Sequence, residues 1–149
     1  MILEGSVKVK APIDKLYDFV MKPESIMGCL PGAEPPTIID DKTYTGVMKQ
    51  KVGVFGVKMK YTMHLVETEK PKFMKYEGDG EDMTKLGRFN MKMDVRLNQV
   101  GDEVEIVYTV DVSIVGKLAM FGDRIMKQKT KQIEAETTKN LQEKLKAMA

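Results

Sequence analysis

Between Ile38 and Ile114 apolar and polar residues alternate, which is the pattern of strands that bury one face and expose the other. The alternation is clearest in three runs, which begin at Val57, Phe89 and Val104. Such strands are typical of antiparallel sheets, and the short turn sequences between the runs predict sequential hairpins. The predicted inward positions are Val57, Met59, Tyr61, Met63 and Leu65; Phe89, Met91, Met93, Val95 and Leu97; and Val104, Ile106, Tyr108, Val110, Val112 and Ile114.

The two ends of the chain carry other patterns. Residues 2–10 alternate loosely and predict a first strand, whereas Pro12 and Pro23 each predict the start of a short helix. After Gly116 the apolar period becomes 3.6, which predicts a long C-terminal helix. The apolar stripe of this helix is Leu118, Gly122, Ile125 or Met126, Thr130, Ile133, Thr137, Leu141 and Leu145.

These elements predict an α+β fold of the helix-grip kind. About seven antiparallel strands curve around the long C-terminal helix, and the two short helices follow the first strand. The apolar face of the sheet needs a cover, and the C-terminal helix is the only predicted element long enough to provide it. No repeat, linker or low-complexity segment interrupts the pattern, so residues 1–149 are expected to form a single domain.

Composition narrows the function. Charged residues make up 31% of the chain and the net charge is +2, which lacks the basic excess of nucleic-acid-binding proteins, so no nucleic acid partner is expected. The single cysteine, Cys29, excludes an intramolecular disulfide. The sequence contains no signal-peptide pattern and no run approaching the roughly 20 apolar residues of a spanning helix. The expected location is therefore the cytoplasm, with at most a peripheral position at the inner face of the membrane.

Several predicted inward positions are small or polar where a filled core would have large apolar residues: Gly46, Gln50, Gly78, Gly80, Thr130 and Thr137. One interpretation is a hollow with apolar walls and a few polar contacts, as in small-molecule pockets. Its predicted lining is Met48, Gln50, Met59, Tyr61, Met63, Tyr76, Gly78, Met91, Tyr108, Met126, Thr130, Ile133 and Thr137. The alternative is a filled core, in which glycines bend strands, threonines bond back to helix carbonyls, and the thirteen methionines replace leucine.

Residues that could carry catalysis or bind a metal are sparse. His64 is the single histidine and falls on the polar face of its strand, and Cys29 lies in a turn of a different element, so the two do not form a metal site. No glycine-rich loop predicts a phosphate site. The inward tyrosines could polarise a ligand carbonyl, but no inward His, Asp, Glu or Arg is expected. The sequence therefore predicts no catalytic residue, no metal and no cofactor. The inward tyrosines are Tyr44, Tyr61, Tyr76 and Tyr108.

Basic residues recur on the predicted outward face of the sheet, where acidic residues also lie. The favoured interpretation is a solvated face of mixed charge, and the alternative is a docking surface for anionic lipid or an acidic partner. The basic residues are Lys49, Lys51, Lys58, Lys60, Lys75, Arg88, Lys92 and Arg96, and the acidic ones are Glu77, Asp79, Asp94, Glu105 and Asp111.

Four sequence segments carry a family resemblance. They are Cys29-Leu30-Pro31-Gly32, Lys51-Val52-Gly53, Gly78-Asp79-Gly80 and the run from Gly116 to Arg124, in this order. Together they resemble the carbon monoxide dehydrogenase G-subunit family, within the START-like and polyketide-cyclase-like helix-grip superfamily. The resemblance extends from about Leu3 to Leu145, and the first and last segments are its specific parts.

The resemblance implies an accessory role. Such proteins are usually encoded with aerobic, molybdenum-containing carbon monoxide dehydrogenases without being part of the catalytic complex. The family is associated with membrane recruitment of that enzyme and with handling its quinone acceptor. Many members carry a C-terminal extension that is taken to be a membrane anchor. This sequence ends at Ala149, so stable anchoring is not expected, although transient contact with a membrane surface is compatible with the sequence.

Three functions are compatible with these observations. The first is a non-catalytic accessory protein that carries a hydrophobic small molecule, quinone-like or lipid, for a molybdenum-containing dehydrogenase. The second is an enzyme of the cyclase or aromatase type with tyrosines as acids. The third is a docking or assembly factor without a ligand. The expected lack of inward charged residues favours the first function over the second.

Overall fold

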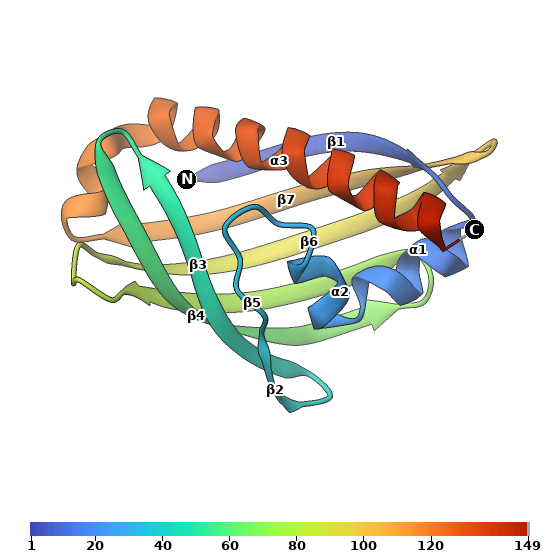
Figure 1. The fold of residues 1–149 in the computed structure, drawn as a ribbon, viewed down its shortest axis with the longest axis horizontal. Helices are drawn as coiled ribbons and strands as arrows, with labels where there is room; N and C mark the ends of the chain where they lie inside the picture. Colours follow the sequence, from blue (N-terminus) through green and yellow to red (C-terminus); the bar gives the residue numbers. More distant parts are fainter. Residues whose placement is uncertain (149) are drawn as a thin grey trace.

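In the computed structural model, which describes residues 1–148, seven antiparallel strands form one sheet (Figure 1). The spatial order is β1-β7-β6-β5-β4-β3-β2, so β2 to β7 are joined as successive hairpins and β1 lies beside the last strand. This arrangement confirms the predicted fold class. The strands are β1 (Ile2–Lys10), β2 (Thr37–Asp40), β3 (Thr43–Val52), β4 (Phe55–Glu69), β5 (Phe73–Asp82), β6 (Arg88–Val100) and β7 (Glu103–Val115).

The helices lie on one face of the sheet. Helices α1 (Ile13–Val20) and α2 (Pro23–Met27) follow β1, as predicted. Figure 1 shows α3 (Gly122–Ala147) crossing the sheet, with its first turns near the β3–β4 hairpin and its last turns near α1. The sheet and the long helix therefore form the two walls of the molecule.

The C-terminal helical segment is not continuous, in contrast to the prediction. A 3-10 helix, η1 (Lys117–Phe121), precedes α3. Gly116 and Gly122 flank η1 with φ angles of 89° and 75°, in the left-handed region that glycine adopts without steric cost. The chain therefore turns at both glycines, and Leu118 packs from η1 rather than from the long helix.

The apolar core is divided between the two ends of the sheet. The larger cluster lies around α1 and the last turns of α3, where Leu16, Leu97 and Val104 are buried. The smaller cluster joins the β3–β4 hairpin to η1 through Val52, Val57 and Leu118. Most of the inward residues discussed below belong to these clusters or pack against them.

Side chains of α3 also cover the free edge of the sheet at β1. The Gln142 side chain accepts a hydrogen bond from the Lys10 N–H at 2.8 Å and donates one to the Lys10 carbonyl at 3.2 Å. Farther along, Lys131 Nζ donates to the Glu4 carbonyl at 3.4 Å. An edge strand presents unpaired backbone groups, and these contacts satisfy part of them while fixing α3 along β1.

Candidate functional site

The inward face of α3 is packed at one end and open at the other. Leu141 and Leu145, near its C-terminus, are the buried residues of this helix. The predicted lining residues in its earlier turns, Met126, Thr130, Ile133 and Thr137, are only half-buried. These side chains are therefore packed less completely than the last turns of α3, and we call the predicted ligand space between them and the sheet the hollow.

The sheet contributes the opposite wall of the hollow. The predicted lining residues Met48, Met59, Met91 and Tyr108 are half-buried, whereas Tyr61, Met63 and Tyr76 are buried. All seven belong to the inward face, as the alternation predicted. The structure thus places the predicted apolar residues opposite the open part of α3, and their role toward a ligand stays a prediction.

A cleft of about 560 Å³ opens beside the hollow, between the β3–β4 hairpin, α3 and the loop after α2. Gln50 and Val57 from the sheet, Pro31 and Gly32 from the loop and Lys129 from α3 are among its lining residues. A second depression of about 460 Å³ lies on the outer face of the sheet, where charged and polar side chains line it. The second depression lies on the face of the sheet away from α3, whereas α3 lines the first cleft, so the first cleft is the better entrance.

The loop after α2 connects the two walls at this cleft. Its Ala33 pairs with Met48, and the Lys49 N–H donates to the Gly32 carbonyl at 2.8 Å, so the loop extends the edge of β3. On the other side, Asn140 Nδ2 donates to the Cys29 carbonyl at 3.0 Å. The Cys-Leu-Pro-Gly segment therefore lies between sheet and helix, which gives a structural reason for its distinctive sequence.

Two hydroxyl groups, those of Tyr61 and Thr137, are buried without a hydrogen-bond partner among residues 1–148. We call them the orphan hydroxyls. The Tyr61 side chain is 4% exposed and packs edge-to-face against Tyr44, with ring centroids 6.1 Å apart. Burial raises the pKa of Tyr61 from 10 to about 12, so its hydroxyl remains a donor at neutral pH. A buried hydroxyl without a partner costs free energy, so these two groups are candidates for the polar contacts of a ligand.

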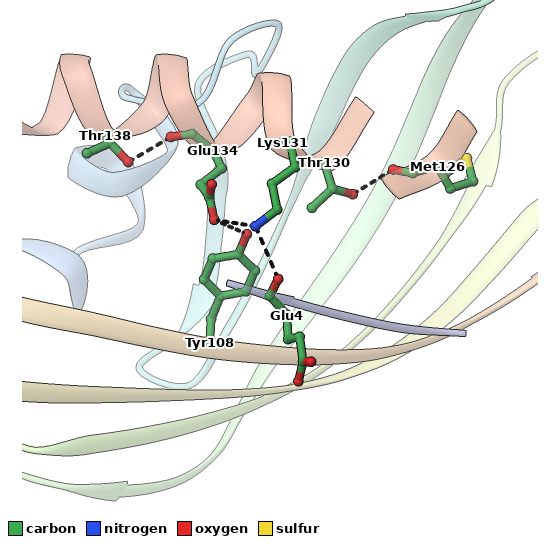
Figure 2. Close-up of polar contacts among 7 residues, drawn as sticks. All are labelled: Glu4, Tyr108, Met126, Thr130, Lys131, Glu134 and Thr138. Carbon is green, nitrogen blue, oxygen red and sulfur yellow. Dashed lines mark hydrogen bonds and ion pairs between the residues drawn. The ribbon is translucent and has the colours of Figure 1, made fainter. Parts of the chain in front are cut away.

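The other predicted polar contacts already have partners. Gln50 Nε2 donates to the Pro31 carbonyl at 2.6 Å and lies 3.4 Å from Met48 Sδ. The Thr130 hydroxyl donates to the Met126 carbonyl at 2.8 Å, which is the back-bonding that the filled-core alternative expected (Figure 2). Gln50 still lines the cleft, but Thr130 has less reason than Thr137 to bind a ligand.

The inward glycines do not leave empty volume, and this part of the prediction was wrong. A Cβ atom on Gly78 would lie 2.4 Å from Met63 Sδ, and one on Gly46 would lie 2.6 Å from the Tyr61 hydroxyl. At Gly80 it would meet the Phe89 ring at 2.3 Å. Large side chains from neighbouring strands therefore lie across each glycine, which is a known way to protect glycine in a sheet. Gly78 makes room for Met63 rather than for a ligand.

Sequence reasoning missed two inward carboxylates, that of Glu134 on α3 and that of Asp82, which is buried and pairs with inward Met59. The Tyr108 hydroxyl donates to Glu134 Oε1 at 2.5 Å, and Lys131 Nζ lies 3.4 Å from the same oxygen (Figure 2). Gly5 leaves the space for this pair, because a Cβ there would lie 2.1 Å from Glu134 Oε1. The expectation of no inward acid was therefore wrong. Helical spacing could have indicated the position of Glu134, since it lies four residues after Thr130 on the inward stripe.

This pair changes the acidity of its tyrosine. Burial and the bond to the Glu134 carboxylate raise the pKa of Tyr108 well above its ordinary value of 10. The pair joins α3 to β7 beside β1, so it constrains the distance between the helix and the sheet at this point.

His64 and Cys29 lie outside the hollow. His64 is exposed on the outer face, as predicted, with Nδ1 3.3 Å from the Thr43 hydroxyl. Cys29 is buried in the larger core cluster, and burial raises the pKa of its thiol. Among the residues that the structure describes, no group of three or more His, Cys, Asp or Glu side chains is arranged to hold a metal ion. Within residues 1–148, no helix combines the length and apolar character needed to cross a membrane.

The comparison with protein families decides the classification. The family model for the G subunit of carbon monoxide dehydrogenase (CoxG) matches residues 5–146 of the 149-residue chain. The chain belongs to the CoxG family. This membership confirms the resemblance inferred from the sequence segments. No curated protein sequence matches the chain.

Solved structures place this CoxG family member among helix-grip folds. A conserved protein from Geobacillus kaustophilus superposes with a TM-score of 0.90 at 18% identity, covering 99% of this chain and 96% of the other. A START superfamily protein from Mycobacterium smegmatis gives 0.74 at 10% identity, with 99% of each chain covered. An aromatase/cyclase from Streptomyces sp. R1128 gives 0.69 at 12% identity, covering 98% and 93%. At these identities the likeness concerns the fold alone.

Proposed function

We propose that this protein is a non-catalytic accessory protein that carries a quinone-like lipophilic molecule in the hollow between α3 and the sheet. Its partner would be a molybdenum-containing carbon monoxide dehydrogenase, in keeping with the family to which the chain belongs. The proposed location is the cytoplasm, with a peripheral encounter at the inner face of the membrane.

The orphan hydroxyls carry this proposal. They belong to opposite walls, Tyr61 to β4 and Thr137 to α3, and each is buried without a protein partner among residues 1–148. A quinone has carbonyl acceptors on opposite sides of an apolar ring, so it could accept a hydrogen bond from each wall. Half-buried methionines such as Met48, Met59 and Met91 would surround the apolar part, because the flexible thioether adapts to irregular ligands.

The first test is to identify and bind a ligand. Organic extraction of the purified protein, followed by mass spectrometry, should release a lipophilic molecule. Titration with a short-chain quinone should quench tyrosine fluorescence in a saturable way. If no quinone or fatty acyl ligand quenches the fluorescence of the wild type, the carrier proposal fails and the docking-factor function becomes the better one.

The second test removes the orphan hydroxyls one at a time. Tyr61→Phe and Thr137→Val should each weaken quinone binding about three- to tenfold, the equivalent of one hydrogen bond. Thr138→Val is the matched control, because the Thr138 hydroxyl already donates to the Glu134 carbonyl at 2.7 Å. Equal affinities of all three variants and the wild type would place the ligand elsewhere.

One observation favours the cyclase-type alternative, and another argues against it. Glu134 and Tyr108 form an inward acid–tyrosine pair of the kind that could act on a carbonyl. However, the raised pKa of Tyr108 makes it a weaker acid at neutral pH, and its hydroxyl already donates a hydrogen bond to Glu134. The pair is therefore better explained as a structural link, and Glu134→Gln should leave quinone affinity within about twofold of wild type.

A further inference from the structure

Three loops meet at the end of the molecule where α3 begins. They are the β3–β4 turn at residues 53–54, the β5–β6 turn at 83–87 and the segment 116–125 (Figure 1). The rings of Phe55 and Phe121 pack with centroids 5.5 Å apart, and the Leu118 N–H donates to the Leu86 carbonyl at 3.0 Å. We call this surface, formed by the three loops and the strand residues next to them, the loop end.

Large apolar side chains are concentrated on the loop end. Val54 is 89% exposed at the hairpin tip and Met120 is 84% exposed in η1. Phe55, Met83, Val115 and Ile125 are also exposed there, so six of the twelve exposed large hydrophobic residues among residues 1–148 lie on this one surface. Scattered single residues need no explanation, but such a concentration marks an interaction surface.

Basic residues surround these apolar side chains. Lys85, Lys117 and Arg124 lie within the loops, and exposed Lys51, Lys58, Arg88 and Lys127 flank them. Exposed acids nearby are Asp123 and Glu81, whereas the carboxylate of Asp82 is buried within the β5–β6 turn. The turns at the other end of the sheet have an acidic excess instead, since residues 40–42, 69–72 and 101–103 contain five acidic and three basic residues.

The outer face of the sheet is less suited to an anionic partner than the loop end. Its strand register places His64 beside Glu77, Glu77 beside Lys92 and Lys92 beside Asp111. From Glu77 to Asp111, charges of opposite sign thus alternate across the strands and neutralise one another locally. This pattern supports the mixed, solvated face that the sequence favoured.

We infer that the loop end binds the surface of an anionic phospholipid bilayer. Val54 and Met120 enter the boundary between head groups and acyl chains, and the surrounding lysine and arginine side chains contact lipid phosphates. Apolar tips on separate loops fit a soft bilayer better than a rigid protein partner. The cleft shares Lys51 and Lys58 with the loop end, so a docked molecule holds the cleft at the lipid surface. This last consequence, ligand exchange with the bilayer, rests on the proposed carrier function, but the docking does not.

The test uses the full chain without added quinone. Sedimentation with phosphatidylcholine vesicles containing about 30% phosphatidylglycerol should pull down the protein, and pure phosphatidylcholine vesicles should not. Val54→Ser with Met120→Ser should weaken binding about tenfold, because both apolar contacts are lost. Lys117→Glu with Arg124→Glu should abolish the preference for anionic vesicles. The matched control is Ile38→Ser with Ile39→Ser, since these side chains on β2 are exposed outside the loop end.

Several outcomes would overturn the inference. The inference is wrong if wild type does not sediment with anionic vesicles, or if the Val54/Met120 variant binds them as well as wild type does. It is also wrong if the Ile38/Ile39 control loses as much vesicle binding as the Val54/Met120 variant. A dimer that the Val54/Met120 variant abolishes, with vesicle binding intact, would make the loop end a protein contact instead. Quinone titration in vesicle-free solution should be the same for the Val54/Met120 variant and wild type, so failure of docking is distinguishable from failure of the carrier proposal.

Discussion

At the residue scale, Asp82 shows how a buried charge organises a turn. Its carboxylate accepts hydrogen bonds from the N–H groups of Lys58, Thr84 and Leu86 at 2.9–3.1 Å and from the Thr84 hydroxyl at 2.5 Å. Burial alone would raise the pKa of Asp82, but the hydrogen bonds from Thr84, Leu86 and Lys58 together hold it below its ordinary value of 3.8. The β5–β6 turn of the loop end therefore depends on an ionised side chain.

We expect Asp82→Asn to lower the free energy of unfolding by about 2 kcal/mol at neutral pH, because an amide accepts fewer and weaker bonds than a carboxylate. A lowered pKa in the folded state stabilises the fold above the ordinary pKa, and this stabilisation is lost as the pH falls through the lower, folded-state value. The difference between wild type and variant should therefore shrink in acid, as measured by urea unfolding from pH 7 to pH 3. Asp79→Asn, on the exposed face of β5, is the control and should change little.

Sequence periodicity predicted which residues face inward, but it did not predict the bonding of their polar atoms. Tyr61 and Tyr108 lie on the inward face as expected, yet one hydroxyl is an orphan and the other donates to Glu134. The difference depends on which side chains of other elements lie within reach of each hydroxyl, which no local pattern encodes. For the same reason, periodicity could not show that side chains of neighbouring strands fill the volume beside the inward glycines.

At the element scale, α3 is unevenly anchored. Leu141 is 4% exposed within the larger core cluster, whereas Ile133, two turns earlier, is half-buried beside the hollow. The sequence assigned both residues to one stripe, because periodicity reports the direction of a side chain and not the depth of its packing. The break at Gly122 was missed for a related reason, since the apolar residues of η1 continue the helical spacing.

Truncation of these two side chains should separate the packed end of α3 from its open part. Leu141→Ala should lower the free energy of unfolding by about 2–4 kcal/mol, because it leaves a cavity in a filled core. Ile133→Ala should cost about 1 kcal/mol or less, since water already reaches this position. Chemical unfolding of both variants measures the difference. Equal losses would mean that α3 is packed along its whole length.

At the scale of the whole molecule, residues that line the proposed hollow belong to or pack against both core clusters, so a ligand there should act as a missing piece of core. Binding only to the folded state at about 100 times its dissociation constant would add about 2.7 kcal/mol of stability. For a domain of this size we expect a rise in melting temperature of about 6–10 °C, measured by differential scanning fluorimetry with a short-chain quinone. Under the same quinone concentration, Thr137→Val should show a smaller rise. A melting temperature that does not respond to quinone would argue against a ligand between the clusters.

The covered glycines restrict the order in which this sheet can change during evolution. Met63 occupies the place of a side chain at Gly78, Tyr61 does so at Gly46 and Phe89 at Gly80. A larger residue at one of these glycines becomes acceptable only after its covering side chain has become smaller. Each glycine and its cover therefore form an epistatic pair, and the first mutation of a neutral path must occur at the larger residue.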